Sequence, residues 1–300
     1  MNRIIVTALA AVLFGFAGAA SAQQVDFSKV EVKTTDLGHN TYMLEGAGGN
    51  VTVAVGGDGV IMVDSQFAPM HDKLKAAIAA LTNQPVRYVV NTHYHGDHTG
   101  GDEAFAKDGA IVVANVNVKK RLADGSVNGL TGAKTPGVSG QALPAKTYTS
   151  ATTLRVKGRL AKLGHPKNAH TDGDTYVYFA DANVLSTGDV VTLGRYPNID
   201  FANGGNIKGM IAGAYTYLKL ANAQTKIVPG HGRLASKADL VAYRAILVTA
   251  RDRMAKLVKA GRSEQDVLAA KPFADLDAKV GANEQQSTNF IRVVYHSLKP

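Results

Sequence analysis

Short β-rich runs separated by glycines fill residues 30–63. Apolar runs such as residues 51–55 and 60–63 are bounded by Gly-Gly and Gly-Gly-Asp-Gly segments, which are typical of tight turns between strands. This pattern predicts four antiparallel strands. Residues 69–81 then carry apolar side chains at helical spacing, and the valine-rich residues 86–90 predict a further strand.

After residue 90 the chain alternates between strand and helix signals. Helices are predicted at residues 102–107, 207–221, 237–258 and 284–298, and strands at 111–114, 154–156, 175–179, 183–187 and 226–228. Residues 124–147 are rich in Gly, Ser, Thr and Pro and predict a long loop. Two strand-rich stretches, each followed by helices, predict an α+β fold in which two sheets pack face to face with helices outside, a four-layer sandwich.

The first 22 residues predict a cleaved export signal. Arg3 gives a short positive start, residues 4–20 form an apolar run, and an Ala-Ser-Ala triplet supplies the small residues that a signal peptidase reads. The alternative is a permanent membrane anchor, but the run is rich in Ala and Gly and short for a spanning helix. We therefore expect residues 23–300 to form a single domain, periplasmic or secreted, that is not held in a membrane.

The chain contains no cysteine, which excludes disulfides, a zinc-thiolate site and lipid attachment through cysteine. Transition-metal ligands must therefore come from His, Asp or Glu. The formal charge is +9, and subtracting the single charge of Arg3 in the signal leaves +8 for the mature chain. Such an excess favours an anionic substrate, although a solvated basic face also explains it, and no aromatic interleaving indicates nucleic-acid binding.

Four metal-competent side chains lie within six residues, directly after the strand predicted at residues 86–90. The segment is His93-Tyr94-His95-Gly96-Asp97-His98. Imidazole and carboxylate groups are nitrogen and oxygen ligands of zinc, and a turn at the end of a strand can point several of them at one spot. The alternative is a His-rich surface turn that binds metal adventitiously.

Three further positions place a metal-competent residue beside glycine, after a β-rich run or in a loop. They are His170 in Asn-Ala-His-Thr-Asp-Gly-Asp, Asp189 in Ser-Thr-Gly-Asp, and His231 in Pro-Gly-His-Gly. Each one alone is compatible with a capped turn or a hydrogen-bonded loop histidine. Together with the six-residue cluster, they supply the ligands that a two-metal site would otherwise lack.

The order of these motifs resembles the metallo-β-lactamase-fold hydrolase superfamily over nearly the whole mature chain. The resemblance implies an αββα sandwich that holds two zinc ions, or other divalent transition metals, at one edge of the sheets. By position it implies one metal site of His93, His95 and His170, a second of Asp97, His98 and His231, and Asp189 as the bridging ligand. Asp64, which follows residues 60–63, matches a carboxylate that supports the ligands.

For function, the resemblance implies hydrolysis of a small-molecule substrate. Two cations that share a water lower its pKa, so that metal-bound hydroxide attacks a β-lactam, lactone or thioester carbonyl. Asp97 is the expected catalytic residue, because its second carboxylate oxygen would orient the nucleophile.

Zinc β-lactamases of the largest subclass resemble this chain at Gly205-Asn206-Ile207, but they have a cysteine in place of Asp189 and a lysine in place of Thr192. On this resemblance Arg195 would bind a substrate carboxylate and Asn206 would polarise a carbonyl. Three alternatives stay open: a phosphodiesterase on the same two-metal site, a non-catalytic metal- or ligand-binding module, and a redox di-iron centre.

Overall fold

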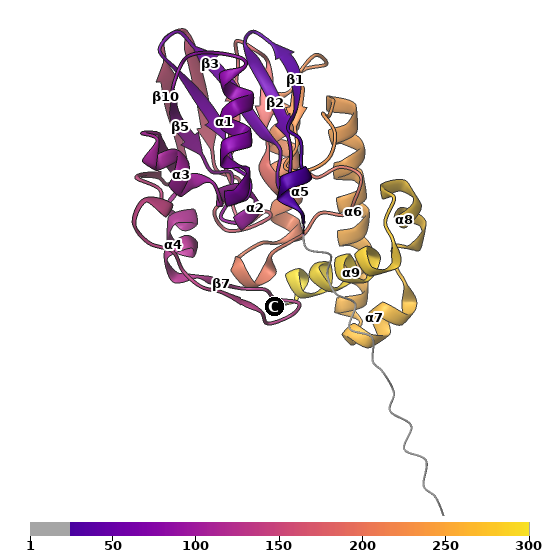
Figure 1. Cartoon of the computed structure of the whole chain (residues 1–300). Helices are drawn as coiled ribbons and strands as arrows, with labels where there is room; N and C mark the ends of the chain where they lie inside the picture. The colour runs from indigo at the N-terminus through magenta and orange to yellow at the C-terminus, as the bar shows by residue number, and fades with distance from the viewer. Residues whose placement is uncertain (1–24, 300) are drawn as a thin grey trace, which may run out of the picture.

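Two large sheets form the centre of the protein, whose computed structural model describes residues 25–299 (Figure 1). The export signal predicted for residues 1–22 lies outside the described residues. One sheet has seven strands in the order β1 (Lys33–Gly38), β2 (Thr41–Glu45), β3 (Val51–Gly56), β4 (Gly59–Val63), β5 (Val86–Val90), β6 (Ile111–Asn115) and β9 (Lys146–Tyr148). The other has the order β10 (Ala151–Val156), β11 (Arg159–Gly164), β12 (Tyr176–Phe179), β13 (Val184–Ser186) and β14 (Lys226–Val228).

Helices cover the outer face of each sheet (Figure 1). The helices are α1 (His71–Ala79), α2 (Gly96–Thr99), α3 (Asp102–Lys107), α4 (Val116–Asp124), α5 (Ile207–Leu220), α6 (Lys237–Lys259), α7 (Glu264–Ala270), α8 (Ala274–Val280) and α9 (Glu284–Leu298). Leu74 of α1 and Phe105 of α3 belong to the apolar cluster on the first sheet, together with Met62. Leu240 of α6 belongs to the cluster on the second sheet, together with Ile227.

A third apolar cluster fills the space between the two sheets. Ile61 and Val63 of β4 belong to this inner cluster, whereas their neighbours Val60 and Met62 belong to the cluster under α1 and α3. Alternate side chains of a strand point to opposite faces, so a strand buried on both faces is apolar throughout. The layers are therefore helix, sheet, sheet and helix, which confirms the predicted four-layer αββα sandwich.

Parallel strand pairs carry the loops that form the site. The strands β1 to β4 are antiparallel neighbours, as predicted, but β5 pairs with β4 in parallel and β14 pairs with β13 in parallel. The helix α1 makes the first crossover and α5 lies in the second. The carboxyl ends of parallel neighbours meet at one edge of a sheet, and this is where ligands bind in many α/β folds.

Several elements were not predicted from the sequence. The strand β11 reads Arg-Leu-Ala-Lys-Leu-Gly and contains no β-branched residue, yet it pairs along its whole length with β10 across a turn at Gly158, where φ is +79°. The helices α4, α7 and α8 were also missed. The predicted loop at residues 124–147 contains a two-stranded hairpin, β7 (Ser126–Val127) with β8 (Lys134–Thr135), as well as β9 at the edge of the first sheet.

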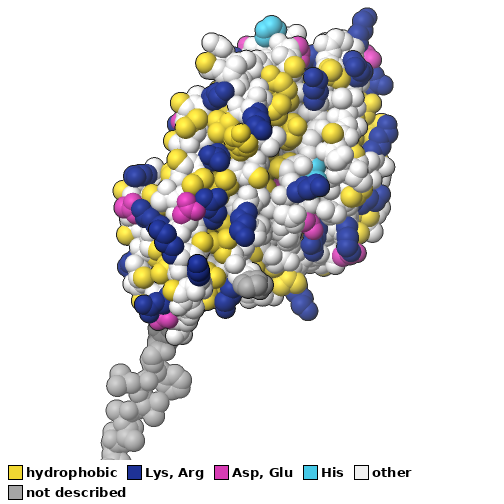
Figure 2. All heavy atoms as spheres, turned by 180° about the vertical axis from the view of Figure 1, so that it is seen from behind, with side chains coloured by type: hydrophobic (Ala, Val, Ile, Leu, Met, Phe, Trp, Pro, Cys, Tyr) yellow, Lys and Arg dark blue, Asp and Glu magenta, His cyan; other side chains and the backbone are white. Residues whose placement is uncertain are grey.

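Basic side chains are spread over the face of the molecule that Figure 2 shows. On the face opposite to that of Figure 1, Lys and Arg lie scattered among apolar and uncharged atoms (Figure 2). This is the arrangement of a solvated basic face. Within residues 25–299, no helix combines the length and the apolar character needed to cross a membrane.

Candidate metal centre

The loop after β5 carries four of the predicted ligands. Its start is fixed by Thr92, whose backbone carbonyl accepts a hydrogen bond from the N–H of Thr175 in the second half of the chain (2.6 Å). His93 and His98 are completely buried. The loop then turns into the single-turn helix α2, which contains Asp97 and His98.

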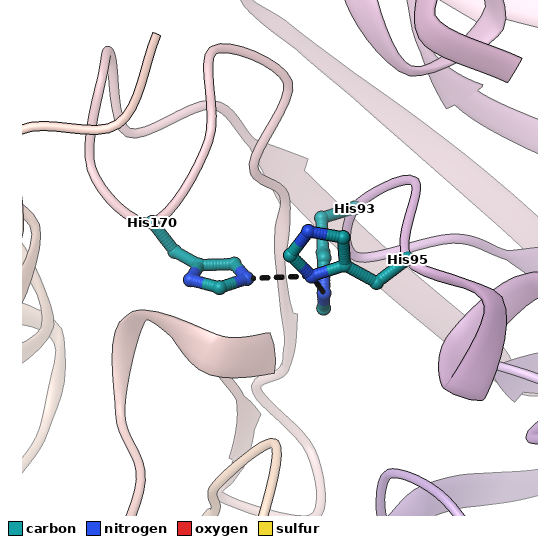
Figure 3. A group of neighbouring side chains, drawn as sticks. All are labelled: His93, His95 and His170. Carbon is teal, nitrogen blue, oxygen red and sulfur yellow. Dashed lines mark hydrogen bonds between the residues drawn. The ribbon is translucent and has the colours of Figure 1, made fainter. Parts of the chain in front are cut away.

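His93, His95 and His170 form the first group of ligand atoms (Figure 3). His95 Nδ1 lies 3.1 Å from His93 Nε2 and 3.0 Å from His170 Nε2. His170 comes from the loop that precedes β12, 75 residues after His95 in the sequence. Three imidazole nitrogens that face one point form a donor set typical of a nitrogen-ligated transition metal.

Asp97, His98 and His231 form the second group. His98 Nε2 lies 3.3 Å from His231 Nε2 and 3.5 Å from Asp97 Oδ2, and His231 Nε2 lies 3.2 Å from the same carboxylate oxygen. His231 belongs to the loop that follows β14. Two nitrogens and one oxygen again converge, which is the mixed donor set expected of a borderline cation.

Asp189 lies between the two groups. Its Oδ1 is 3.3 Å from His98 Nε2, and its Oδ2 is 3.4 Å from His231 Nε2 and 3.8 Å from His170 Nε2. Among the described residues, the buried Oδ1 accepts no hydrogen bond. A buried carboxylate oxygen without a partner is costly, and a cation would supply the missing one. Gly230 is needed beside it, because a Cβ there would collide with Asp189 Oδ1.

Asp64 contacts Nδ1 of His98, the ring nitrogen that faces away from the second group, as expected of a supporting carboxylate. Its Oδ2 lies 2.8 Å from His98 Nδ1 and also accepts the hydroxyl of Thr92 (2.7 Å), while its Oδ1 accepts the Thr92 backbone N–H (2.7 Å). This arrangement places the proton of His98 on Nδ1 and leaves Nε2 to face the second group. Asp64 adopts a left-handed backbone conformation, with φ of 64°, a strained geometry that often occurs at functional sites.

Asp200 supports His95 in the same way, although sequence reasoning did not identify it. Its Oδ2 lies 3.1 Å from His95 Nε2 and also accepts the hydroxyl of Tyr94, while its Oδ1 accepts Asn203 Nδ2 (2.8 Å). The backbone carbonyl of Asn198 supports His170, because it lies 2.8 Å from His170 Nδ1. Asp200 follows Asn198-Ile199 without a glycine-rich motif, so no local signal marked it.

Burial sets the protonation of His93 and His170 in the first group. It lowers the pKa of His170 to about 4, and it lowers that of His93 well below the ordinary value, an effect to which the neighbouring His98 adds. Both rings are therefore neutral at pH 7. Their lone pairs are available for a metal ion.

Carboxylates dominate the second group. Burial would raise the pKa of Asp97, but the hydrogen bond with His231 and the charge of His98 lower it to about 2. Burial would lower the pKa of His98, but Asp189 and Asp64 outweigh it and raise the pKa well above its ordinary value. Without a metal ion, His98 therefore carries an extra proton, and this positive charge balances the carboxylates of Asp64 and Asp189. A metal ion must displace this proton, so metal affinity should increase with pH.

The residues therefore fit a two-metal centre. All seven predicted ligands lie in three overlapping groups, His93-His95-His170, His93-His98-Asp189 and Asp97-His98-His231, within which the ligand atoms are no more than 4.8 Å apart. Supporting acceptors hold the outer ring nitrogens of His95, His98 and His170.

Asp64→Asn is expected to weaken zinc binding about 10- to 100-fold, because the amide no longer stabilises the Nδ1–H of His98 by charge. Competition against a fluorescent zinc chelator measures the affinity. Asp252→Asn is the matched control, since Asp252 is exposed on α6 and pairs with its neighbour Arg251. An Asp64→Asn protein with the affinity of the control would contradict the supporting role.

A cavity of about 380 Å³ lies against the second group, and the predicted substrate-binding residue Arg195 lines it together with Asp97 and His231. Asn206 lies elsewhere. Its Oδ1 accepts the N–H of Lys208 (2.8 Å) as the cap of α5, and its Nδ2 donates to the carbonyl of Ser297 (2.6 Å).

The expectation that Asn206 polarises a carbonyl is therefore corrected, because Asn206 does not line this cavity and its side chain caps α5. Asn198 lies in the loop that precedes α5, is exposed and lines the cavity. It is therefore the asparagine of that loop that a substrate in the cavity would contact.

The sequence profile of the Metallo-beta-lactamase superfamily matches residues 44–233, a stretch that contains all seven predicted ligands. The chain is 31% identical over 153 residues to the 2,4-dinitroanisole O-demethylase subunit alpha of Nocardioides sp. (strain JS1661), covering 49% of this chain and 43% of that one. The chain thus spans less than half of that relative's length. It is 30% identical over 147 residues to the probable metallo-hydrolase YqgX of Bacillus subtilis (strain 168), covering 48% of this chain and 67% of that one.

Solved structures share the fold. The metallo-beta-lactamase from Pontibacter korlensis superposes with a TM-score of 0.59 at 19% sequence identity, covering 73% of this chain and 99% of that one. At this identity the similarity establishes the architecture alone.

Proposed function

The chain belongs to the metallo-beta-lactamase superfamily of metallo-hydrolases, and from this premise we propose that it is a dinuclear zinc hydrolase acting on a carbonyl group of a small molecule. β-Lactams, lactones and thioesters are the candidate substrate classes. The observation that carries the proposal is the position of Asp189, a buried carboxylate between two groups of three predicted ligands, whose Oδ1 makes no hydrogen bond of ordinary geometry among the described residues and lies 3.3 Å from His98 Nε2.

Bound zinc ions would lower the pKa of a coordinated water and polarise the carbonyl that it attacks. The side chains of the protein would position the metal ions and the attacking water. Asp97 is ionised at neutral pH, lies at the cavity wall and keeps 27% of its side chain exposed, so it is placed to orient a water molecule and to accept its proton. Buried neutral His93 and His170 supply nitrogen ligands without adding charge.

The purified protein is expected to bind two zinc ions per chain and to hydrolyse at least one carbonyl substrate in a zinc-dependent manner. Elemental analysis after dialysis measures the stoichiometry, and a panel of β-lactam, lactone, thioester and phosphodiester substrates, with and without a chelator, measures turnover. One zinc per chain at saturation would contradict the dinuclear centre. Turnover of phosphodiesters alone would favour the phosphodiesterase alternative, and no turnover at all would favour a binding module.

We also propose that the chain is exported and cleaved after residue 22, which the sequence pattern of residues 1–22 supports. Terminal sequencing of protein from a periplasmic extract should find Gln23 first. Full-length protein in the membrane fraction would contradict this proposal.

A further inference from the structure

We infer that Asn50 is a positioning residue for the second ligand group, because it joins the loop of His231 to the loop that carries Asp97 and His98. The inference rests on the proposed function, since it assigns a metal ion to this group. Asn50 lies directly before β3, and its side chain is buried. In the sequence it stands more than 40 residues before the six-residue ligand cluster, beside no other metal-competent residue.

Asn50 binds the loop of His231 at three points. Its Nδ2 donates to the backbone carbonyl of Pro229 (3.0 Å) and to that of Gly232 (2.8 Å), and its own backbone N–H donates to the carbonyl of Gly230 (2.8 Å). The three acceptors lie on both sides of His231, within two residues of it. A carbonyl can only accept, so these bonds fix the NH₂ end of the amide and use both of its protons.

The residue before Asn50 binds the other half of the group. The backbone N–H of Gly49 donates to the carbonyl of Asp97 (2.9 Å). Gly49 also packs so closely on His98 that a Cβ at this position would lie 2.1 Å from the imidazole ring. Gln66 Nε2 donates to the carbonyl of Gly49 (2.8 Å). Two successive residues thus connect the two loops of the group, whose histidines lie 133 positions apart in the sequence.

The strand that follows Asn50 gives this connection a rigid base. β3 pairs with β2 on one side and with β4 on the other, and its first four residues are buried. A side chain at the end of a packed strand is positioned more precisely than one in a loop. The loop of His231 follows β14 of the other sheet, so Asn50 links the two sheets at the edge where the ligand groups lie.

Removal of the amide should displace the loop of His231. The buried carbonyl of Pro229 would lose its donor, and a buried acceptor without a partner is costly. Metal–ligand distances tolerate changes of only about 0.2 Å, so a small movement of this loop would weaken a metal ion at the second group. The first group should not respond, because its three histidines lie on other loops.

Asn50→Ala tests the inference through the two zinc affinities, which stepwise competition with a chelator measures. Zinc at the second group should bind about tenfold or more weakly, as when other outer contacts of metal ligands are removed, while the affinity of the first group changes less than about twofold. The absorption of bound Co²⁺ identifies the weakened site, since Asn50→Ala and His231→Ala should lose the same bands. Asn50→Ser removes the same NH₂ group with a smaller void, so it replaces Asn50→Ala if that variant does not fold.

Asn115→Ala is the matched control. Asn115 is a buried asparagine whose Nδ2 also donates to a backbone carbonyl, that of Thr149 (2.9 Å), and whose Oδ1 caps α4. Its loss destabilises the fold at another place, so both zinc affinities should stay at the wild-type values. Unchanged zinc binding in folded Asn50→Ala, equal weakening of both of its sites, or the same selective loss in Asn115→Ala would overturn the inference.

A wild-type protein that binds one zinc ion would contradict the dinuclear centre, and hydrogen exchange of the metal-free protein then tests the role of Asn50 alone. The N–H of Gly230 donates to two backbone carbonyls of the neighbouring loop (2.9 and 3.0 Å), so its exchange reports whether the two loops stay together. Asn50→Ala should speed exchange at residues 230–232 about fivefold or more relative to Asn115→Ala, the factor that corresponds to one lost hydrogen bond. Equal exchange in the two variants would overturn the inference.

Discussion

Asp189→Ala is expected to lower kcat/KM by roughly 10³-fold, the loss that corresponds to several kcal/mol of transition-state stabilisation by a metal ion. The reason is the position of Asp189, whose two oxygens approach His98, His231 and His170 within 3.3 to 3.8 Å. Without this carboxylate, no negatively charged side chain lies between the two ligand groups to bind both metal ions. Zinc content should fall from two ions per chain to one or fewer, which elemental analysis measures together with steady-state kinetics.

The exposed Asp124 on α4 provides the control for this substitution, since Asp124→Ala removes a carboxylate that pairs with Lys120 on the same helix. Circular dichroism of Asp189→Ala, with and without zinc, separates loss of the metal from loss of the fold. A folded Asp189→Ala protein that keeps two zinc ions and wild-type turnover would contradict the assignment of Asp189 as the bridging ligand.

Asp97→Asn is expected to reduce kcat about 10²-fold or more at saturating zinc, in the range of general acid–base contributions. Asparagine preserves the size of the side chain and one possible oxygen ligand, but it removes the charge that orients and deprotonates a water molecule. Because the pKa of Asp97 lies at about 2 in the folded protein, the wild-type carboxylate is ionised throughout the neutral range. The loss of turnover should therefore not depend on pH between about 6 and 8.

His231→Ala provides the comparison for Asp97→Asn. It removes a ligand of the second group, while His93, His95 and His170 stay complete. Added zinc should therefore restore part of its activity, whereas it should not restore that of Asp97→Asn. The reverse pattern, with Asp97→Asn rescued by zinc and His231→Ala inactive at saturating metal, would show that the two roles have been assigned wrongly.

The site was most predictable from the sequence where several metal-competent residues lie in one short segment, because the backbone alone keeps them close together. His93, His95, Asp97 and His98 follow directly on a strand, so their proximity was nearly guaranteed by the backbone. His170, Asp189 and His231 were separated in sequence, and only the glycine-containing motifs around them and the family resemblance connected them. The structure brings all seven together.

Residues whose role depends on tertiary contacts could not be identified in this way. Asp200 reaches His95 across 105 positions of sequence, and nothing beside it in the chain predicts that contact. Asn206 shows the opposite error, because a resemblance in three residues suggested a substrate contact where the folded chain uses the side chain to cap α5. The strand β11 was missed because pairing with β10, and not its own composition, determines its conformation.

The predicted ligands come from both halves of the chain, and we expect this to affect how the protein folds. His98 and His231 lie 133 positions apart, and His95 and His170 lie 75 apart. We expect contacts of such long range to form only after the two sheets have docked, because closing a long loop costs conformational entropy that earlier contacts must offset. Zinc should therefore slow unfolding and leave the refolding rate nearly unchanged, a difference that stopped-flow measurements with and without zinc would detect. The metal ions would then stabilise the finished fold kinetically and take no part in its nucleation.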